Sequence, residues 1–202
     1  DLDIVVIEKG GSEQFRLFLN HGFIDEEIVL EEAYSFAQFD SSSSRTLAIA
    51  DFDGDGDQDV YVPRKFGINW LFENRTLTGS QGNVTYNPNP NPRFIEVSES
   101  YNVHDNSFER LGSMGYGAAW GDYDNDEDLD LYLSNWGPNR LFRNDGNVFT
   151  EVGEGYNLTS EELSNGAGWG DFNNDGRIDI WAANIREHDH VFINLNEQWS
   201  AD

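Results

Sequence analysis

Short apolar segments alternate along the chain with polar segments rich in Gly, Asp, Asn and Ser. The apolar segments are three or four residues long and hold many β-branched and aromatic side chains. Runs of this length and composition, bounded by turn-forming residues, are typical of strands and not of helices. Residues 26–33 are an exception, because Glu-Glu-Ile-Val-Leu-Glu-Glu-Ala is compatible with a short helix. The pattern as a whole predicts an all-β chain.

A nine-residue acidic loop occurs three times, each time between two apolar segments. The copies cover residues 51–59, 122–130 and 171–179. Asp or Asn fills positions 1, 3, 5 and 9 in every copy, and their oxygens converge if the loop wraps around one point. Oxygen ligands in that number suit a hard cation, and calcium above all. An EF-hand is excluded, since its position 12 requires Glu and is Val, Leu or Ala here.

A second landmark follows each loop at a nearly constant distance. It consists of an apolar residue, Phe, any residue and Asn, and its asparagines are Asn74, Asn144 and Asn194. They lie 15, 14 and 15 residues after the last Asp of their loops. Further apolar segments begin at Phe94 and Phe149. Four short strands per unit, with 49 residues between two successive loops, are typical of a propeller blade.

The repeat divides the chain into about four units. We expect a partial first repeat with an irregular stretch over residues 1–46 and a second repeat with an Asn/Pro-rich insertion over 47–114. A third repeat covers 115–164, and a fourth, expected to lack its last strand, covers 165–202. Because Asp1 and Asp3 match loop positions 7 and 9, we also expect the chain to be part of a larger propeller.

Two strings in the third unit resemble a known family. Gly115-Tyr-Gly-Ala-Ala-Trp-Gly-Asp122, followed after the loop by Asn139-Arg-Leu-Phe-Arg-Asn-Asp-Gly146, is similar to an FG-GAP/VCBS repeat of integrin-α-like calcium-binding β-propellers. The resemblance implies seven blades of four antiparallel strands. It also implies one calcium ion in the loop between the first two strands of a blade. Side chains at positions 1, 3, 5 and 9 and the carbonyl of position 7 are then its ligands.

These positions give the predicted metal ligands of three calcium sites. They are Asp51, Asp53, Asp55, Asp57, Asp59, Asp122, Asp124, Asp126, Asp128, Asp130, Asp171, Asn173, Asp175, Arg177 and Asp179. Glu127 departs from the pattern, because it stands at position 6 of the second loop, where a sharp turn favours Gly.

Charge and composition exclude several classes of partner and chemistry. The net charge of −26 makes nucleic acid and anionic membranes poor partners. The chain has no Cys, hence no disulfide or thiolate chemistry, and no apolar run long enough to insert into a membrane. Calcium loops of extracellular modules bind at roughly 0.1–1 mM. We therefore expect an extracellular, secreted or cell-surface location.

No nucleophile elbow, phosphate loop or catalytic triad order is present, so we expect no enzyme. The favoured function is a scaffold or adhesion module that binds a protein partner or neighbouring copies, including head-to-tail assembly. The alternative is a lectin-like propeller that binds carbohydrate. Exposed aromatic rings at Trp70 and Trp136, expected on connections between strands, would support the alternative. Trp120 and Trp169, at equivalent positions, are expected in the core.

Two smaller features complete the candidates. Three glycosylation sequons begin at Asn74, Asn83 and Asn157, of which Asn83, in the irregular insertion, is the best glycan candidate. The His188-Asp-His190 segment is interpreted as a solvated turn and not as a metal site.

Overall fold

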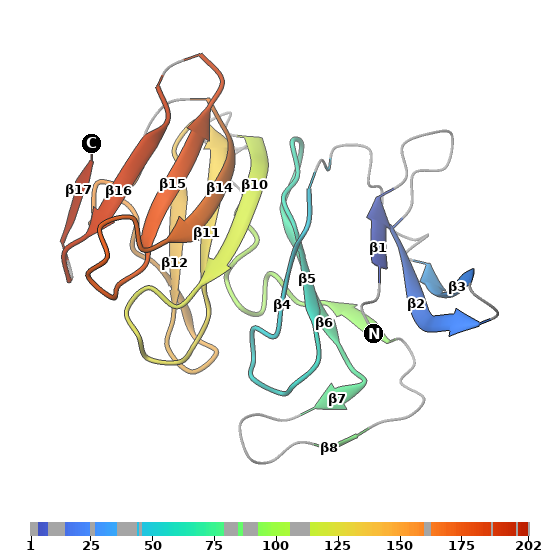
Figure 1. Ribbon diagram of the computed structural model, residues 1–202. Coiled ribbons are helices and arrows are strands. Elements are labelled where there is room, and N and C mark those ends of the chain that lie inside the picture. Colours follow the sequence, from blue (N-terminus) through green and yellow to red (C-terminus); the bar gives the residue numbers. More distant parts are fainter. Residues whose placement is uncertain are drawn as a thin grey trace. The chain divides into compact units, whose positions relative to one another are not determined.

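The computed structural model describes residues 4–7, 15–24, 27–35, 44, 46–78, 85–86, 93–105, 114–159, 163–186, 188–196 and 198–201. The chain divides into two compact units, Asp1–Ser44 and Arg45–Asp202 (Figure 1). Within the described residues every regular element is a β-strand. That part of the chain holds no helix with the length and apolar character needed to cross a membrane.

The first unit holds a three-stranded antiparallel sheet in the order β1-β2-β3. Its strands are β1 (Ile4–Ile7), β2 (Phe15–Ile24) and β3 (Glu27–Ser35). The helix expected over residues 26–33 is therefore wrong. Glu27–Ser35 pair with β2, from Ile24↔Glu27 to Asn20↔Leu30 and beyond, because pairing with a neighbouring strand overrides a weak local helix preference.

The second unit holds three antiparallel sheets of four strands, each arranged in sequence order and consistent with propeller blades. Blade 2 consists of β4 (Ala48–Ala50), β5 (Asp59–Val62), β6 (Trp70–Asn74) and β9 (Phe94–Glu96). Blade 3 consists of β10 (Met114–Gly121), β11 (Asp130–Trp136), β12 (Arg140–Asn144) and β13 (Phe149–Glu151). Blade 4 consists of β14 (Ser164–Gly170), β15 (Asp179–Asn184), β16 (His190–Asn194) and β17 (Trp199–Ala201). In the insertion of the second repeat, β7 (Leu77–Thr78) pairs with β8 (Thr85–Tyr86).

Blade 4 corrects one expectation about the repeat. The fourth unit was expected to lack its last strand, but β17 pairs with β16 from Asn194↔Trp199 to Phe192↔Ala201. The strand escapes sequence reasoning because it is three residues long and has a polar residue, Ser200, between Trp199 and Ala201. The blade has its fourth strand because the backbone of β16 provides hydrogen-bond partners, which the local sequence of this segment does not reveal.

The cores of the second unit lie between successive blades. Between blades 2 and 3, buried residues from both sheets form one cluster, which includes Phe52, Tyr61, Leu131 and Phe142. The equivalent cluster between blades 3 and 4 includes Tyr123, Tyr132, Ile180 and Phe192. Trp120 packs against the first cluster and Trp169 against the second, as predicted. Blades 2 and 3 are thus each covered by the next blade in sequence.

Small residues let the first strands of blades 3 and 4 approach closely. Strand β10 lies beside β14 (Figure 1). A Cβ on Gly117 would lie 2.9 Å from the Cα of Gly166, and a Cβ on Gly121 would lie 2.8 Å from the ring of Trp169. Both distances are shorter than carbon atoms tolerate, so glycine at these positions is a packing requirement.

Candidate metal centre

Each acidic loop connects the first and second strands of a blade. The strand pairs that close the loops are Ala50↔Asp59, Gly121↔Asp130 and Gly170↔Asp179. The last residue of every loop is therefore already part of the ladder, and the other eight form the hairpin tip. The expected strand-to-strand connection is confirmed three times.

The carboxylate at position 1 organises the front of the loop. In the first loop, Asp51 accepts hydrogen bonds from the backbone N–H groups of Asp55 (3.0 Å) and Gly56 (2.9 Å). In the third, Asp171 accepts from Asp175 (3.0 Å) and Gly176 (2.9 Å). The second loop repeats the arrangement, since Asp122 accepts from Asp126 and Glu127. The chain thus curls back around the first carboxylate in all three copies.

The carboxylate at position 9 joins the loop to the third strand of its blade. One oxygen of Asp59 accepts from the N–H of Phe52 (3.2 Å), and the other accepts from the N–H of Asn74 (2.8 Å). Asp130 and Asp179 make the same pair of bonds in their loops, to position 2 and to the landmark asparagine. The constant spacing between loop and landmark in the sequence follows from this double contact.

Two positions of every loop adopt positive φ. Position 4 is Gly54, Asn125 or Asn174, with φ between 59° and 71°, and position 6 is Gly56, Glu127 or Gly176, with φ of 97°, 74° and 87°. Left-handed backbone is unstrained for Gly, is tolerated by Asn and is costly for Glu. The second loop thus keeps the left-handed backbone at position 6, although Glu127 has a side chain there.

The first loop fits a cation best. One carboxylate oxygen from each of Asp51, Asp53 and Asp59 lies within 4.8 Å of the other two. Asp57 is buried, and while its Oδ2 accepts from the N–H of Leu77 at 2.6 Å, its Oδ1 has no hydrogen-bond partner. A buried carboxylate oxygen without a partner is costly, and a cation in the loop would satisfy it.

The second loop brings together a different set of three carboxylates. Oxygens of Asp122, Asp124 and Asp126 lie within 4.8 Å of one another. Asp130 remains buried and bonded to backbone N–H groups, and Asp128 accepts from the N–H of Gly146 at 2.7 Å. These residues fit a cation held by side chains from the front half of the loop.

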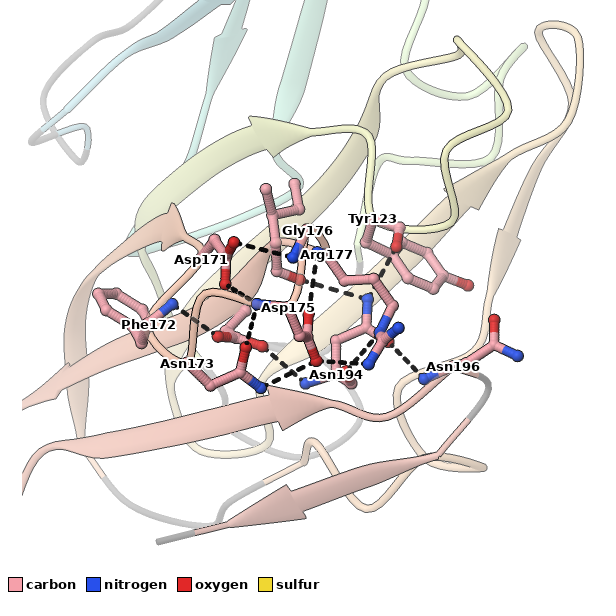
Figure 2. A network of polar contacts seen from close by, with 11 residues as sticks. Tyr123, Asp171, Phe172, Asn173, Asp175, Gly176, Arg177, Asn194 and Asn196 are labelled. Carbon is pink, nitrogen blue, oxygen red and sulfur yellow. Dashed lines mark hydrogen bonds and ion pairs between the residues drawn. The ribbon is translucent and has the colours of Figure 1, made fainter.

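The third loop carries less negative charge (Figure 2). Asn173 replaces Asp at position 3, and its Nδ2 donates to Oδ2 of Asp175 at 3.0 Å. The guanidinium of Arg177 pairs with the same carboxylate, and its Nε donates to the carbonyl of Asn194 at 2.9 Å. Three clustered carboxylates, as in the first two loops, are absent from the described residues of this loop. Its oxygens nevertheless occupy the same loop positions.

Burial and mutual repulsion raise the pKa of several loop carboxyls. Burial raises the pKa of Asp53 to about 6, with the charge of Asp55 adding to the effect, and that of Asp57 to about 7. Burial raises the pKa of Asp59 to about 9 and of Asp130 to about 8, although backbone N–H groups act in the opposite direction. Protons or a cation must therefore compensate the buried charge. A divalent cation favours the ionised forms of all ligands at once.

The landmark asparagines of blades 3 and 4 each join their blade to the acidic loop of the preceding blade. Nδ2 of Asn144 donates to the carbonyl of Phe52 (3.2 Å), and Nδ2 of Asn194 donates to the carbonyl of Tyr123 (2.8 Å). Because position 9 binds the N–H of position 2 in the same loop, an unbroken series of hydrogen bonds runs from Asp179 to Asp59 across three blades. The sequence signals the asparagines by their spacing but not this contact between blades.

The remaining candidate residues of the sequence lie apart from the loops or at their edges. Asn74 is half-buried and its Nδ2 donates to the carbonyl of Gln58, whereas Asn157 lies exposed in a turn with φ of 56°. Asn83 lies outside the described residues. His188 is exposed, and its carbonyl accepts from Nδ2 of Asn184. Glycosylation at the sequons stays a prediction.

The two tryptophans named for a carbohydrate site are placed differently from expectation. Trp70 begins β6 and Trp136 ends β11, so neither lies on a connection between strands. Trp70 is 9% exposed, with the guanidinium of Arg64 3.9 Å from its ring centroid. Trp136 stacks on Tyr116 with ring centroids 4.5 Å apart. Short connections allow the ladders to extend over both residues.

Comparison with known proteins agrees with the repeat and its loops. The FG-GAP-like repeat family matches residues 1–62 and 122–182, which together make up more than half of the chain. The chain therefore belongs to the FG-GAP-like repeat family. A search of curated proteins found no match.

Proposed function

We propose that the chain is a non-catalytic, calcium-binding propeller module that acts as an extracellular scaffold or adhesion domain. The observation that carries the proposal is the recurrence of one loop geometry in three blades, with oxygen atoms at equivalent positions. The carboxylate groupings in the first two loops and the partnerless Oδ1 of Asp57 support a cation in particular.

Calcium is the cation that the ligand types favour. All donors are oxygens, several loop carboxylates are already engaged by backbone N–H groups, and the loop is an irregular hairpin tip. Calcium accepts six to eight oxygens in irregular arrangements, whereas magnesium demands a near-ideal octahedron. Each carboxylate oxygen has two lone pairs and is able to accept a backbone hydrogen bond while it contacts a metal.

Calorimetric titration of chelated protein with calcium tests this proposal. We expect a stoichiometry near three per chain, and a value of zero or one would contradict it. Asp53→Ala removes a ligand of the first loop and is expected to lower the stoichiometry by one. Asp145→Ala is the matched control, because this exposed carboxylate lies outside the loops and pairs with Arg143.

The location and the partner class are part of the same proposal. Extracellular calcium is high enough to fill loops of roughly 0.1–1 mM affinity, and the charge of −26 disfavours anionic surfaces. We propose protein partners or neighbouring copies for this module. Cell fractionation tests the location, since recovery of the protein from the cytosol alone would contradict it.

The two tryptophans named for the lectin alternative do not provide the surface that it requires. A sugar platform needs an accessible aromatic face, but Trp70 is covered and Trp136 has Tyr116 stacked on its ring. The scaffold is therefore the function that we carry forward.

A further inference from the structure

A small cavity lies between blades 3 and 4, beside their acidic loops. Its volume is about 120 Å³. The walls include two arginines, two tyrosines, an acid and an amide, which are Arg143, Arg177, Tyr123, Tyr156, Asp124 and Asn196. Tyr123 comes from blade 3 and Arg177 from blade 4, and their side chains lie near each other (Figure 2). We call this space the junction cavity.

The two arginines of the cavity use only part of their guanidinium groups within the protein. Nε and Nη2 of Arg143 pair with Oδ2 of Asp145, at 3.0 and 2.9 Å. Nε of Arg177 donates to the carbonyl of Asn194, and its Nη2 pairs with Asp175. Within the part of the chain that the structure describes, Nη1 of neither arginine has a hydrogen-bond partner. Because a guanidinium carries five N–H donors, both arginines have donors left for a ligand.

The equivalent positions at the junction of blades 2 and 3 carry the opposite charge. The residue before the landmark asparagine is Arg143 in blade 3 and Glu73 in blade 2, and each pairs with the second residue of its fourth strand. Position 7 of the next acidic loop is Arg177 in blade 4 and Asp128 in blade 3. Two cations thus occupy positions at one junction that two acids occupy at the other. The charge of the junction cavity is therefore not a requirement of the blade packing that both junctions share.

The chemistry of the walls suits a carboxylate. A planar guanidinium binds a carboxylate through two parallel hydrogen bonds, and both arginines already pair with carboxylates of their own blades. Asp124 lines the same cavity and opposes a doubly charged anion more than a singly charged one. The rings of Tyr123 and Tyr156, with centroids 6.3 Å apart, offer an apolar wall to the methylene groups next to a carboxylate.

The net charge of the chain does not prevent such binding. The chain has 38 acidic and 12 basic residues, but exposed charges farther away than about 8–10 Å are largely screened at physiological ionic strength. The nearby guanidinium groups therefore dominate the potential within the cavity. Its volume of about 120 Å³ is well below the roughly 300–1,000 Å³ of sites for free small molecules. The cavity thus has room for the end of one side chain.

We propose that the junction cavity binds an acidic side chain of a protein partner. The carboxylate accepts hydrogen bonds from the guanidinium groups of Arg143 and Arg177, and the methylene groups of the side chain pack against Tyr123 and Tyr156. The inference rests on the proposed scaffold function, because it gives a chemistry to the protein partner of that function. It does not depend on the number of calcium ions that the loops bind.

An NMR titration of the full chain in saturating calcium tests the proposal. The probes are the peptide acetyl-Gly-Glu-Gly-amide, its neutral counterpart acetyl-Gly-Gln-Gly-amide, and acetate, all at constant ionic strength. The Nε–Hε signals of the arginine side chains report on binding. We expect the signals of Arg143 and Arg177 to shift with the Glu peptide and with acetate, and to stay in place with the Gln peptide. No shift of either signal with the Glu peptide would overturn the proposal.

Two variants and one control assign the response to the cavity. Arg143→Gln is expected to weaken binding of the Glu peptide about tenfold, because it removes a charged donor. The fold should tolerate this change, since the ion pair with Asp145 is partly exposed. Arg143→Glu copies the acid of the other junction and is expected to abolish binding. Arg186→Gln, at an exposed arginine in the β15–β16 connection, is expected to leave binding unchanged.

The remaining outcomes separate the possible occupants. Equal weakening in Arg143→Gln and Arg186→Gln would show nonspecific attraction of anions and would overturn the proposal. Binding of acetate without binding of the Glu peptide would assign the cavity to a free small acid, which overturns the partner side chain as occupant. Calcium calorimetry on the same sample keeps this test apart from that of the proposed function. Filled calcium loops without a peptide response would contradict the cavity proposal alone, and a peptide response without calcium binding would contradict the calcium module alone.

Discussion

Nδ2 of Asn194 donates to the carbonyl oxygen of Tyr123 across 2.8 Å, so the end of the third strand of blade 4 lies on the acidic loop of blade 3. The bond is buried, and the same side chain also reaches the carbonyl of Ile178 within its own blade. Asn144 stands in the same relation to Phe52 and Leu129. In blades 3 and 4 the landmark asparagine thus donates both to a carbonyl of its own hairpin and to a carbonyl of the preceding blade.

Replacement of this asparagine is expected to weaken the junction between blades 3 and 4. Asn194→Ala leaves two carbonyls without their donor, one of them buried, and should lower the free energy of unfolding by about 1–3 kcal/mol. Chemical denaturation measures the change. Gln198→Ala is the control, because that residue is exposed and contributes only its backbone carbonyl to the turn. Equal losses in both variants would contradict the role of the side chain.

A methyl group at Gly121 should separate the same two blades. Its Cβ would lie 2.8 Å from Trp169 and 2.9 Å from Ile178, so that the tryptophan has to move. We expect Gly121→Ala to cost about 1–3 kcal/mol of unfolding free energy, as overpacking of an interior does. Gly166→Ala is the matched variant, since no atom lies within 4 Å of its Cβ position. If Gly166→Ala were the more damaging change, the packing explanation would fail.

Replacement of the strained residue Glu127 should strengthen calcium binding at the second loop. Glu127 has a φ of 74°, which costs a residue with a Cβ on the order of 1 kcal/mol relative to Gly. Glu127→Gly is therefore expected to tighten calcium binding at this loop, as measured by calorimetry. Gly56→Ala, at the equivalent position with a φ of 97°, should weaken calcium binding at the first loop. Weaker binding in Glu127→Gly would instead identify the Glu127 carboxylate as a ligand.

The chelated protein should lose stability as pH rises. Burial raises the pKa of Asp59 to about 9 and of Asp130 to about 8 in the folded chain, above the ordinary value of 3.8. Between these limits the folded state binds more protons than the unfolded state, so the free energy of unfolding falls with increasing pH. Denaturation in chelator should therefore show higher stability at about pH 5 than at about pH 8.

Calcium is expected to reduce or reverse that pH dependence, because a cation compensates the ionised carboxylates in place of protons. The same denaturation experiment in saturating calcium provides the comparison. A chelated protein that is more stable at the higher pH would contradict the assigned burial of these two carboxyl groups.

The parts of the fold that the sequence predicted are those with a strong periodic signal. The loops, the strands on either side of them and the landmark strands all carry apolar runs or fixed spacings, and the structure places each of them as expected. Glu27–Ser35 and Trp199–Ala201 carry no such signal, and each forms a strand beside a partner strand. Local sequence cannot show a ladder that is supplied from elsewhere in the chain.

The candidate metal centre was predictable at the level of residue type and less so in its contacts. Position 9 was expected to be a ligand, but in all three loops it also anchors two backbone N–H groups. The aromatic residue at position 2 gave no sign of its role, because Phe52 and Tyr123 act through their backbone carbonyls as well as their rings. Spacing reveals repetition, but it does not reveal which atoms of a repeat meet the next one.

At both junctions in the second unit, the later blade contributes the asparagine donor and the earlier blade contributes the position-2 carbonyl. A gene duplication that copies one whole repeat therefore adds a complete junction and leaves the existing ones intact. Substitutions at these positions, in contrast, damage two neighbours at once. Such a chain is free to change its number of blades during evolution more readily than it can change the residues that join them.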